Sequence, residues 1–181
     1  MTLSIFRANT SKSLQIILLY LTVLTPCLYL VNFLEKISTE NLYTQNQNII
    51  EAMQAGFENE FVFLKTSTIN MSSSPGILPF FLEKNSNGLE GAHTVLDRYS
   101  ANYGFSVCYL MDLEGKVVAS SNRGSPESFM GQDYSFRPYF KEALRGDFSF
   151  YIATGITSKE RGFYGAYPVR DPNGNILGVA V

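Results

Sequence analysis

The segment FSVCYLMDLEGKVVAS, residues 105–120, decides the fold because it predicts a β-hairpin by itself. Two largely apolar runs, 105–111 and 116–120, flank the short sequence Asp-Leu-Glu-Gly at 112–115. An Asp-x-x-Gly sequence between two apolar runs is typical of a turn that joins antiparallel strands. The hairpin therefore predicts an antiparallel sheet in the second half of the chain.

The sequence downstream of the hairpin adds three strands and one helix to this sheet. The further strands are predicted at 148–154, 162–169 and 175–181, with a last turn at Asp171-Pro-Asn-Gly174. A short helix is predicted at 137–144, ended by Gly146. The sum is a five-stranded antiparallel sheet with a helical insertion. The chain stops inside the last apolar run, so we expect a domain truncated at its C-terminus.

The first half of the chain is helical in pattern. From residue 35 to about residue 70 no proline occurs, and apolar residues recur at spacings of three and four, which predicts one long helix. The apolar stripe consists of Ile50, Met53, Phe57, Phe61 and Leu64. The second half of this helix is expected to pack on the following domain through the stripe. The polar stretch 37–48 in the first half could pair with a second copy of the chain in a homodimer. Shorter helices are predicted at 77–83 and at 94–103, the latter capped by Gly104, with a loop at 85–91 between them.

The N-terminal run LQIILLYLTVLTPCLYLVNFL, residues 14–34, carries no charge and is as long as the roughly 20 residues that a membrane helix needs. We assign 13–34 to a transmembrane helix. Arg7 and Lys12 precede it, so the positive-inside tendency places 1–12 in the cytoplasm and the chain from residue 35 outside. A cleaved signal peptide is the alternative, but its apolar region is usually about 7–15 residues and ends at small residues. The run is longer, and 29–33 offers no such cleavage site.

The composition excludes several classes of protein. The net charge of −2 with mixed signs gives no nucleic-acid signature. Cys27 falls in the predicted span and Cys108 in a predicted buried strand, so neither a disulfide nor a zinc site is expected. The single histidine, His93, is expected on a helix surface. No nucleophile, phosphate-binding or metal motif occurs, so we expect no catalytic residue, metal or cofactor, and a surface hydrolase is disfavoured.

Polar groups concentrate first in DYSFRPYF, residues 133–140. Ser135 fits a helix N-cap, with Pro138 inside the first turn. The start of that helix would favour an anion, and Arg137 lies in the same turn. The planar guanidinium of arginine matches a carboxylate through two parallel hydrogen bonds. Tyr139 and Phe140 are assigned to the core.

The second polar segment is ATGITSKERGFY, residues 153–164. It supplies the hydroxyls of Thr154 and Thr157, exposed amides near Gly155 and a second cation, Arg161 or Lys159. The Tyr164 hydroxyl could close the pocket. These groups suit a small carboxylate and contain no acid–base pair for chemistry.

Each segment has a purely structural alternative. Arg137 could pair with Asp133 or Glu142 and only hold the fold. The charges at 159–161 could form a solvated turn.

Four segments resemble one family, in the family's order and spacing: YLMDLEGKVVASSN, MGQDYSFRPYFKEAL, YIATGITSKERGFYGAYPV and GNILGVAV. The chain resembles, over about 57–181, the extracellular Cache (PDC-type, PAS-like) sensor domain of bacterial C4-dicarboxylate sensor histidine kinases. The resemblance implies an α+β fold: a transmembrane helix leads into a long helix at 35–70, which packs on a PAS-like five-stranded antiparallel sheet within 71–181. It also implies a ligand such as succinate, malate or fumarate. Ser135 and Arg137 would hold one carboxylate, Thr157, Arg161 and Tyr164 would surround the other end, and Tyr134 and Gly155 would line the pocket.

We therefore expect the extracytoplasmic sensing portion of a receptor in a bacterial inner (plasma) membrane, with its sensor domain periplasmic or extracellular. The output is expected to be a two-component sensor histidine kinase. Receptors of this family also carry a second PDC-like subdomain, a second span and an output module, which this sequence does not include. The same input domain resembles those of diguanylate cyclases and chemoreceptors. A membrane-tethered binding protein without output is the remaining alternative.

Overall fold

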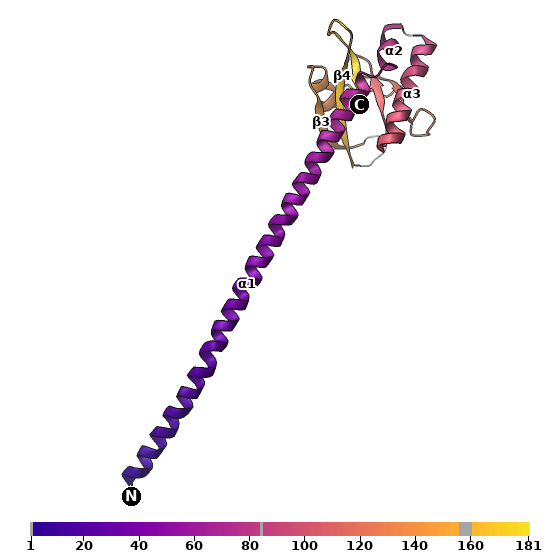
Figure 1. The fold of residues 1–181 in the computed structure, drawn as a ribbon. Coiled ribbons are helices and arrows are strands. Elements are labelled where there is room, and N and C mark those ends of the chain that lie inside the picture. The colour runs from indigo at the N-terminus through magenta and orange to yellow at the C-terminus, as the bar shows by residue number, and fades with distance from the viewer. Residues whose placement is uncertain (1, 84, 156–160) are drawn as a thin grey trace. The chain divides into compact units, whose positions relative to one another are not determined.

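The computed structural model describes residues 2–83, 85–155 and 161–181 (Figure 1). The helices are α1 (Thr2–Ser72), α2 (Ile77–Glu83), α3 (Ser86–Tyr103) and α4 (Pro138–Ala143). The strands are β1 (Tyr109–Met111), β2 (Val117–Ser120), β3 (Ser149–Thr154), β4 (Arg161–Arg170) and β5 (Ile176–Ala180). By its internal contacts the chain divides into two units, Met1–Gly56 and Phe57–Val181.

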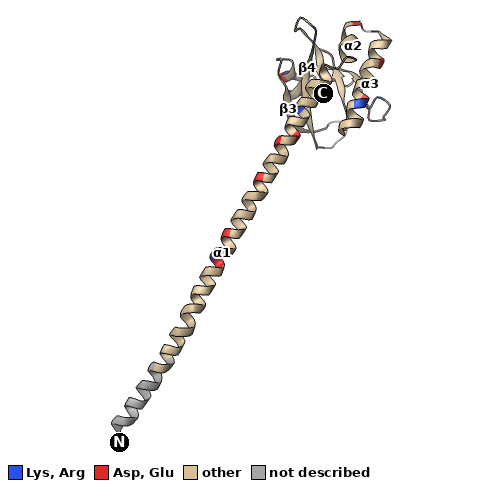
Figure 2. Cartoon of the chain, in the orientation of Figure 1, with Lys and Arg blue, Asp and Glu red and all other residues tan. Residues whose placement is uncertain are grey.

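The first unit consists of helix α1 up to Gly56, and it contains the apolar run. Within the described residues, one helix is long and apolar enough to cross a membrane, judged by length and composition. Figure 2 shows no charged residue in the described part of this helix before Glu35. The hydroxyls of Thr22 and Thr25 donate to the carbonyls of Leu19 and Leu21 at 2.9 and 2.7 Å. The helix thus satisfies these polar groups internally, as an apolar environment requires.

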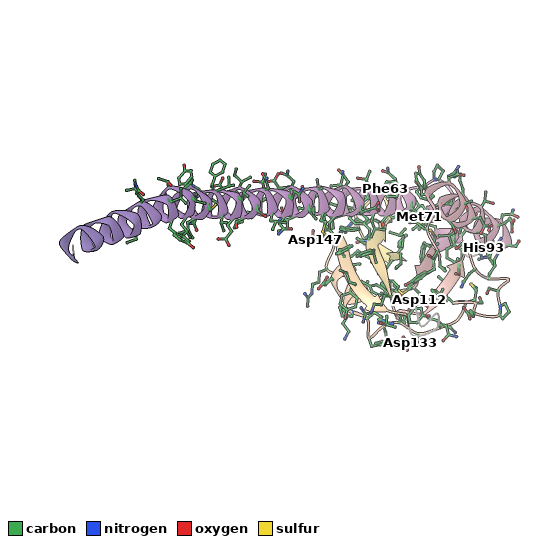
Figure 3. All side chains as sticks on the ribbon, turned by 90° about the horizontal axis from the view of Figure 1, so that it is seen from below. Phe63, Met71, His93, Asp112, Asp133 and Asp147 are labelled. Carbon is green, nitrogen blue, oxygen red and sulfur yellow. The ribbon has the colours of Figure 1, made fainter. Side chains whose placement is uncertain are left out.

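The second unit is built on a fully antiparallel sheet with the strand order β2-β1-β5-β4-β3. Alternate residues of a strand point to opposite faces, so the sheet has two cores. One face packs Leu110 and Ala180 against α2, α3 and the end of α1. The opposite face packs Met111 and Val179 against α4. Met71, at the end of α1, lies on the face of the sheet that packs against α2 and α3 (Figure 3).

The region before the sheet corrects two sequence predictions. Residues 85–91 were expected to form a loop, but α3 already begins at Ser86 because the side chain of Asn85 accepts a hydrogen bond from the Gly88 amide at 2.7 Å. The polar residues that favour loops also favour helix caps, so the composition of 85–91 did not distinguish a loop from the start of a helix. The predicted C-cap is confirmed: Gly104 has φ 71°.

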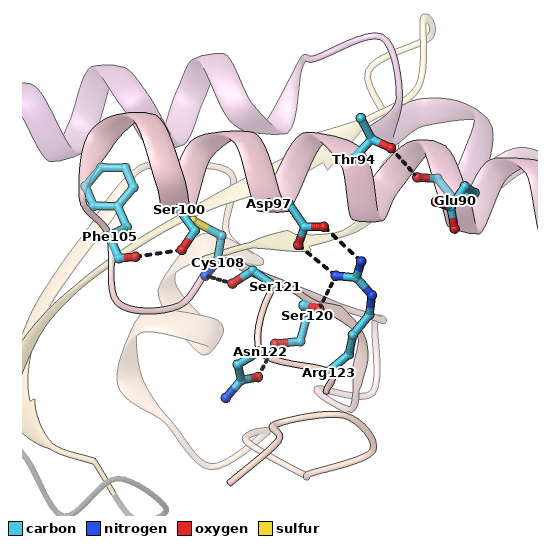
Figure 4. Close-up of polar contacts among 10 residues, drawn as sticks. All are labelled: Glu90, Thr94, Asp97, Ser100, Phe105, Cys108, Ser120, Ser121, Asn122 and Arg123. Atoms are coloured by element: carbon cyan, nitrogen blue, oxygen red, sulfur yellow. Dashed lines mark hydrogen bonds and ion pairs between the residues drawn. The ribbon is translucent and has the colours of Figure 1, made fainter. Parts of the chain in front are cut away.

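His93 was expected on a helix surface, but it is buried, with 8% of its surface exposed. Its helix α3 packs closely on the segment around α2: a Cβ added to Gly76 would lie 2.6 Å from the carbonyl oxygen of Gly91. Arg123, in the loop after β2, adds a bidentate ion pair with Asp97 of α3 at 2.7 and 2.8 Å (Figure 4). Burial, followed by the nearby Arg123 charge, lowers the pKa of His93.

The strand predicted at 105–111 is shorter in the structure, because only Tyr109–Met111 pairs as β1. The carbonyl of Phe105 instead accepts a hydrogen bond from the Ser100 hydroxyl at 2.8 Å (Figure 4). The chain bends at Ser106, and the carbonyl of Cys108 accepts a hydrogen bond from the Ser121 amide at 2.9 Å just before β1 begins. The other predicted strands and the helices at 77–83 and 137–144 agree with the structure to within one or two residues.

Candidate functional site

The start of α4 positions the arginine that the sequence singles out. Arg137 is the N-cap residue, with an extended backbone (φ −69°, ψ 134°), because the ring of Pro138 disfavours helical geometry in the residue before it. The predicted N-cap, Ser135, is therefore wrong: it lies too early in the chain. The amide of Ser135 instead donates to Asp133 Oδ1 at 2.8 Å in a local turn.

The guanidinium of Arg137 has no carboxylate partner among the described residues. Its Nη2 donates to the backbone carbonyl of Thr154 at 3.3 Å, and its Cζ lies 5.4 Å from the centre of the Phe136 ring. Its Nε is buried and has no hydrogen-bond partner in the described part of the chain. The alternative that Arg137 pairs with Asp133 or Glu142 is therefore contradicted. Asp133 accepts a hydrogen bond from the Ser135 amide, and Glu142 accepts one from the Ser149 hydroxyl at 2.6 Å.

Arg137 lines a small cavity of about 10 Å³. Its walls are Tyr109, Phe129, Tyr134, Arg137, Tyr139, Gly155 and Tyr164. This volume is close to what a single water molecule needs. A four-carbon diacid is much larger than a water molecule, so this structure shows the cavity in a closed arrangement.

Four tyrosines line the cavity with the arginine: Tyr109, Tyr134 and Tyr139 are buried, and Tyr164 is partly buried. The hydroxyls of Tyr109 and Tyr139 lie 2.8 Å apart, and the rings of Tyr139 and Tyr164 stack at 5.3 Å with 2° between their planes. Burial raises the pKa of Tyr139 to about 12 and also raises the pKa of Tyr164, although the Arg137 charge acts in the opposite direction on both. These hydroxyls are therefore neutral hydrogen-bonding groups at neutral pH.

The predicted site residues separate into three groups. Four of them line the cavity together: Tyr134, Arg137, Gly155 and Tyr164. Ser135, Thr154 and Arg161 do not line it. Thr154 contributes its backbone carbonyl instead, and Arg161 is exposed at the start of β4. Gly155 is buried, so the expectation of exposed amides there is wrong at that residue. Thr157 and Lys159 lie outside the described residues.

Sequence reasoning missed two wall residues, Tyr109 and Phe129, and placed a third, Tyr139, only in the core. The assignment of Tyr139 to the core is correct, since it is 1% exposed, but its ring also faces the cavity. Tyr109 was the available signal, because a tyrosine inside an apolar strand is buried and a buried phenol usually finds a hydrogen-bond partner nearby.

A second, larger cavity of about 390 Å³ lies in the same unit. It shares Tyr109, Phe129 and Tyr164 with the small cavity, and Val181 lies at its edge. The remaining walls come from the end of α1, from residues 104–108, from Phe150 of β3 and from residues 161–165 of β4.

A long helix leading into an antiparallel five-stranded sheet, with Arg137 beside a small cavity on one face, is the arrangement expected of a Cache or PDC-type sensor domain. Among solved structures, the sensor domain of the Vibrio cholerae histidine kinase DctB superimposes with a TM-score of 0.72 and 28% identity, over 78% of this chain and 55% of that one. The ligand-binding domain of the Campylobacter jejuni chemoreceptor Tlp3 gives a TM-score of 0.60 at 19% identity, over 72% and 54% of the two chains, which supports the fold alone.

Two curated proteins are similar in sequence. The C4-dicarboxylate transport sensor protein DctB of Rhizobium meliloti is 43% identical over 76 residues, which are 42% of this chain and 12% of that protein. The protein of the same name from Pseudomonas aeruginosa is 36% identical over 78 residues, 43% of this chain and 13% of that protein. No family model matches. The chain therefore spans only a small part of these relatives. The resemblance to the sensor region of C4-dicarboxylate sensor proteins, and the fold class it implies, are confirmed.

Proposed function

We propose that this chain is the extracytoplasmic sensing portion of a membrane-bound two-component sensor kinase, and that its second unit binds a small C4-dicarboxylate. The observation that carries the proposal is Arg137, whose buried Nε has no partner in the described residues and whose guanidinium faces a cavity walled by phenols. The sequence similarity to two C4-dicarboxylate sensor proteins supports the same ligand class.

The charge balance of the cavity favours a diacid over an amino acid. Its described walls contain one cation, Arg137, and no carboxylate. The ammonium group of an amino acid needs an acidic partner, and the nearby Asp133 is fully exposed and already accepts a hydrogen bond from a backbone amide. A ligand with two carboxylates needs no such partner. In this proposal, Arg161 and Thr157 serve the carboxylate farther from Arg137.

The energy available at Arg137 is large enough to decide affinity. A hydrogen bond to a charged group contributes about 1.5–3 kcal/mol, so two parallel bonds from one guanidinium contribute about 3–6 kcal/mol. Since about 1.4 kcal/mol corresponds to a factor of ten, loss of Arg137 should weaken binding by about 10²- to 10⁴-fold. Lysine retains the charge but not the paired geometry, so Arg137→Lys should recover only part of this loss.

The proposal includes a membrane location and a dimer. Residues 13–34 would cross a bacterial inner membrane, with 1–12 in the cytoplasm and the second unit outside it. The polar stretch 37–48 would pair with a second copy. Signalling then requires that the ligand favour one of two receptor arrangements energetically, since binding alone changes nothing.

The ligand proposal is tested by thermal unfolding of the whole chain in detergent micelles. Succinate, malate and fumarate should raise Tm, whereas butyrate and L-valine should not. A ligand at 100 times its Kd stabilises a protein by about 2.7 kcal/mol. Arg137→Ala should abolish the rise, and Arg145→Ala, which removes an exposed arginine just after α4, should preserve it. A rise that survives in Arg137→Ala refutes the site, and a rise with L-valine refutes the ligand class.

The output is tested by reading the coding sequence downstream of the codon for Val181. A second apolar span followed by a histidine kinase supports the proposal. A diguanylate cyclase or chemoreceptor module, or a stop codon, supports the alternatives instead.

A further inference from the structure

The β1–β2 hairpin ends in a tight turn that one aspartate holds together. Asp112 Oδ1 accepts hydrogen bonds from the amides of Glu114 and Lys116 at 3.1 and 2.8 Å, and the Asp112 carbonyl accepts one from the Gly115 amide at 3.2 Å. Gly115 closes the turn with φ 89°, in the left-handed region that favours glycine. The conformation of the turn is therefore set by its own residues.

The segment that carries Arg137 lies directly against this turn. Residues 131–134 run antiparallel to residues 115–117, beyond the outer edge of β2, and three backbone hydrogen bonds of 2.9 Å join the two stretches. One of these bonds runs from the Tyr134 amide to the Gly115 carbonyl. The Tyr134 carbonyl then accepts a bond from the Arg137 amide at 2.9 Å, so a single residue links the turn to the arginine through hydrogen bonds.

The close approach of the two stretches leaves no room for a side chain at Gly115. A Cβ added there would lie 2.5 Å from the Cα and 2.7 Å from the amide nitrogen of Ser135. These are backbone atoms, and ordinary contacts begin at 3.4 Å, so the backbone of Ser135 would have to move away by about 0.9 Å. A shift of that size is enough to break a hydrogen bond, since N–H···O bonds span only about 2.7–3.2 Å. Gly115 is buried, although its neighbours Glu114 and Lys116 are exposed.

A second turn of the same form lies between β4 and β5. Asp171 Oδ1 accepts hydrogen bonds from the amides of Asn173 and Asn175, each at 2.8 Å, and Gly174 also has φ 89°. Gly174 is exposed, and a Cβ added to it would have no described atom within 4 Å. The two glycines therefore have the same backbone requirement, and only Gly115 is also in close contact with a neighbouring segment.

We propose that Gly115 is a positioning residue for the ligand site: the turn supports the segment 131–137, and the missing side chain of Gly115 sets the distance between the turn and Arg137. Tyr134, whose amide bonds to Gly115, also walls the small cavity, so the turn holds two of the cavity walls in place. A side chain at residue 115 displaces both walls. The effect on ligand binding rests on the proposed function, but the position of Arg137 can be measured without a ligand.

The first test measures the surroundings of Arg137 by NMR, using the whole chain in detergent micelles with isotope-labelled arginine. The Nε–H signal of Arg137 is identified by its loss in Arg137→Lys. Because this Nε is buried, its proton should exchange slowly with water in the unaltered protein. Gly115→Ala should shift the signal and speed the exchange by about tenfold or more, whereas Gly174→Ala should change neither. Both variants place alanine at the same positive φ, so both should lower Tm. An unchanged Arg137 signal in Gly115→Ala overturns the proposal.

A second pair of variants decides the question if Gly115→Ala does not fold. Asp112→Ala removes the acceptor that holds the first turn and adds no bulk, and Asp171→Ala does the same in the second turn. Asp112→Ala should change the Arg137 signal and Asp171→Ala should not. Equal signals in the two variants overturn the proposal.

Gly115→Asn separates the two requirements at this position. Asparagine adopts a positive φ more readily than alanine but brings the same Cβ. The Arg137 signal should therefore be displaced in Gly115→Asn as it is in Gly115→Ala. Recovery of the unaltered signal in Gly115→Asn would show that only the backbone angle matters, and would overturn the role of the contact with Ser135.

The last test adds succinate and measures its affinity by calorimetric titration. If succinate binds the unaltered protein, Gly115→Ala should weaken its affinity by about tenfold or more, and Gly174→Ala should leave it unchanged. Equal affinities for the two variants overturn the proposal. If succinate does not bind the unaltered protein, the proposed ligand is wrong, and the Arg137 signal decides the positioning role by itself.

Discussion

The hydroxyl pair of Tyr109 and Tyr139 tests the buried wall of the small cavity beside Arg137. The two side chains are 2% and 1% exposed, and their hydroxyls lie 2.8 Å apart. Tyr109→Phe removes one hydroxyl and leaves the other without this partner in a buried place. An unsatisfied buried polar group costs about 1–3 kcal/mol, whereas replacing both partners by apolar groups of the same shape is nearly neutral.

A double-mutant cycle measures this asymmetry. For a chain of this length, about 1 kcal/mol shifts Tm by about 2–4 °C, so each single Phe variant should lower Tm by about 2–12 °C. The double variant should lie within about 4 °C of the unaltered protein. The assay is thermal unfolding of the four proteins, with the ring stacking on Tyr164 retained in each. If the double variant loses as much as the two single variants combined, the two hydroxyls are independent and the described pairing is wrong.

Three further predictions concern other parts of the second unit. The pKa of Tyr139 is raised from 10 to about 12, so the folded state holds this proton more strongly than the unfolded state, and the stability of the fold should fall as pH rises from 10 to 12. Thermal unfolding at a series of pH values measures this fall, and an unchanged Tm over the interval would contradict the burial of Tyr139. Gly165→Val should lower the free energy of unfolding by about 1–3 kcal/mol because the new side chain meets α1, whereas Gly124→Ala, at an open position, should lower it much less. Equal Tm values for the two variants would contradict this packing. Arg123→Ala should raise the pKa of His93, because the nearby charge lowers it; NMR titration of this single histidine measures the change, and a fall would refute the assignment.

Elements defined by neighbouring residues were predictable from the sequence. The turn after β1 has the expected form: Asp112 Oδ1 accepts hydrogen bonds from the amides of Glu114 and Lys116, and Gly115 has φ 89°. Helix α2 occupies the residues predicted for it. Such signals are local, because the side chain that caps or turns the chain is within a few residues of the backbone it bonds.

Features that depend on distant partners were not predictable. His93 is buried and lies near Arg123, which is far from it in the chain, and nothing in its own sequence neighbours carries that information. Residues 105–108 have the composition of a strand, but a strand exists only where a partner lies beside it. Composition predicted a strand over the whole segment, but the chain bends at Ser106 and forms a strand only from Tyr109.

The candidate site shows the same division. Arg137 was found from its own segment, because the following proline and the surrounding aromatic residues are adjacent in sequence. Tyr109 lies on a different strand and reaches the site only through the fold, by its contact with Tyr139. A cavity wall contributed by the core of the sheet looks in sequence like any other core residue.

The closed cavity limits how a diacid could act as a signal, since a ligand shifts an equilibrium only if it favours one arrangement over another. Arg137 now donates to the Thr154 carbonyl at 3.3 Å, and a shorter, charge-assisted bond to a carboxylate would be the stronger interaction. Thr154 ends β3 and Tyr164 lies on its partner β4, so in the proposed function a diacid at Arg137 would have to separate α4 from this strand pair to make room for itself. The next residue, Gly165, lies against Leu64 of α1 with no room for a Cβ. The end of α1 thus contacts β4 on both sides of Tyr164, through Leu64 at Gly165 and through Phe57 at Phe163, so in the proposed function a displacement of β4 would act on this part of α1.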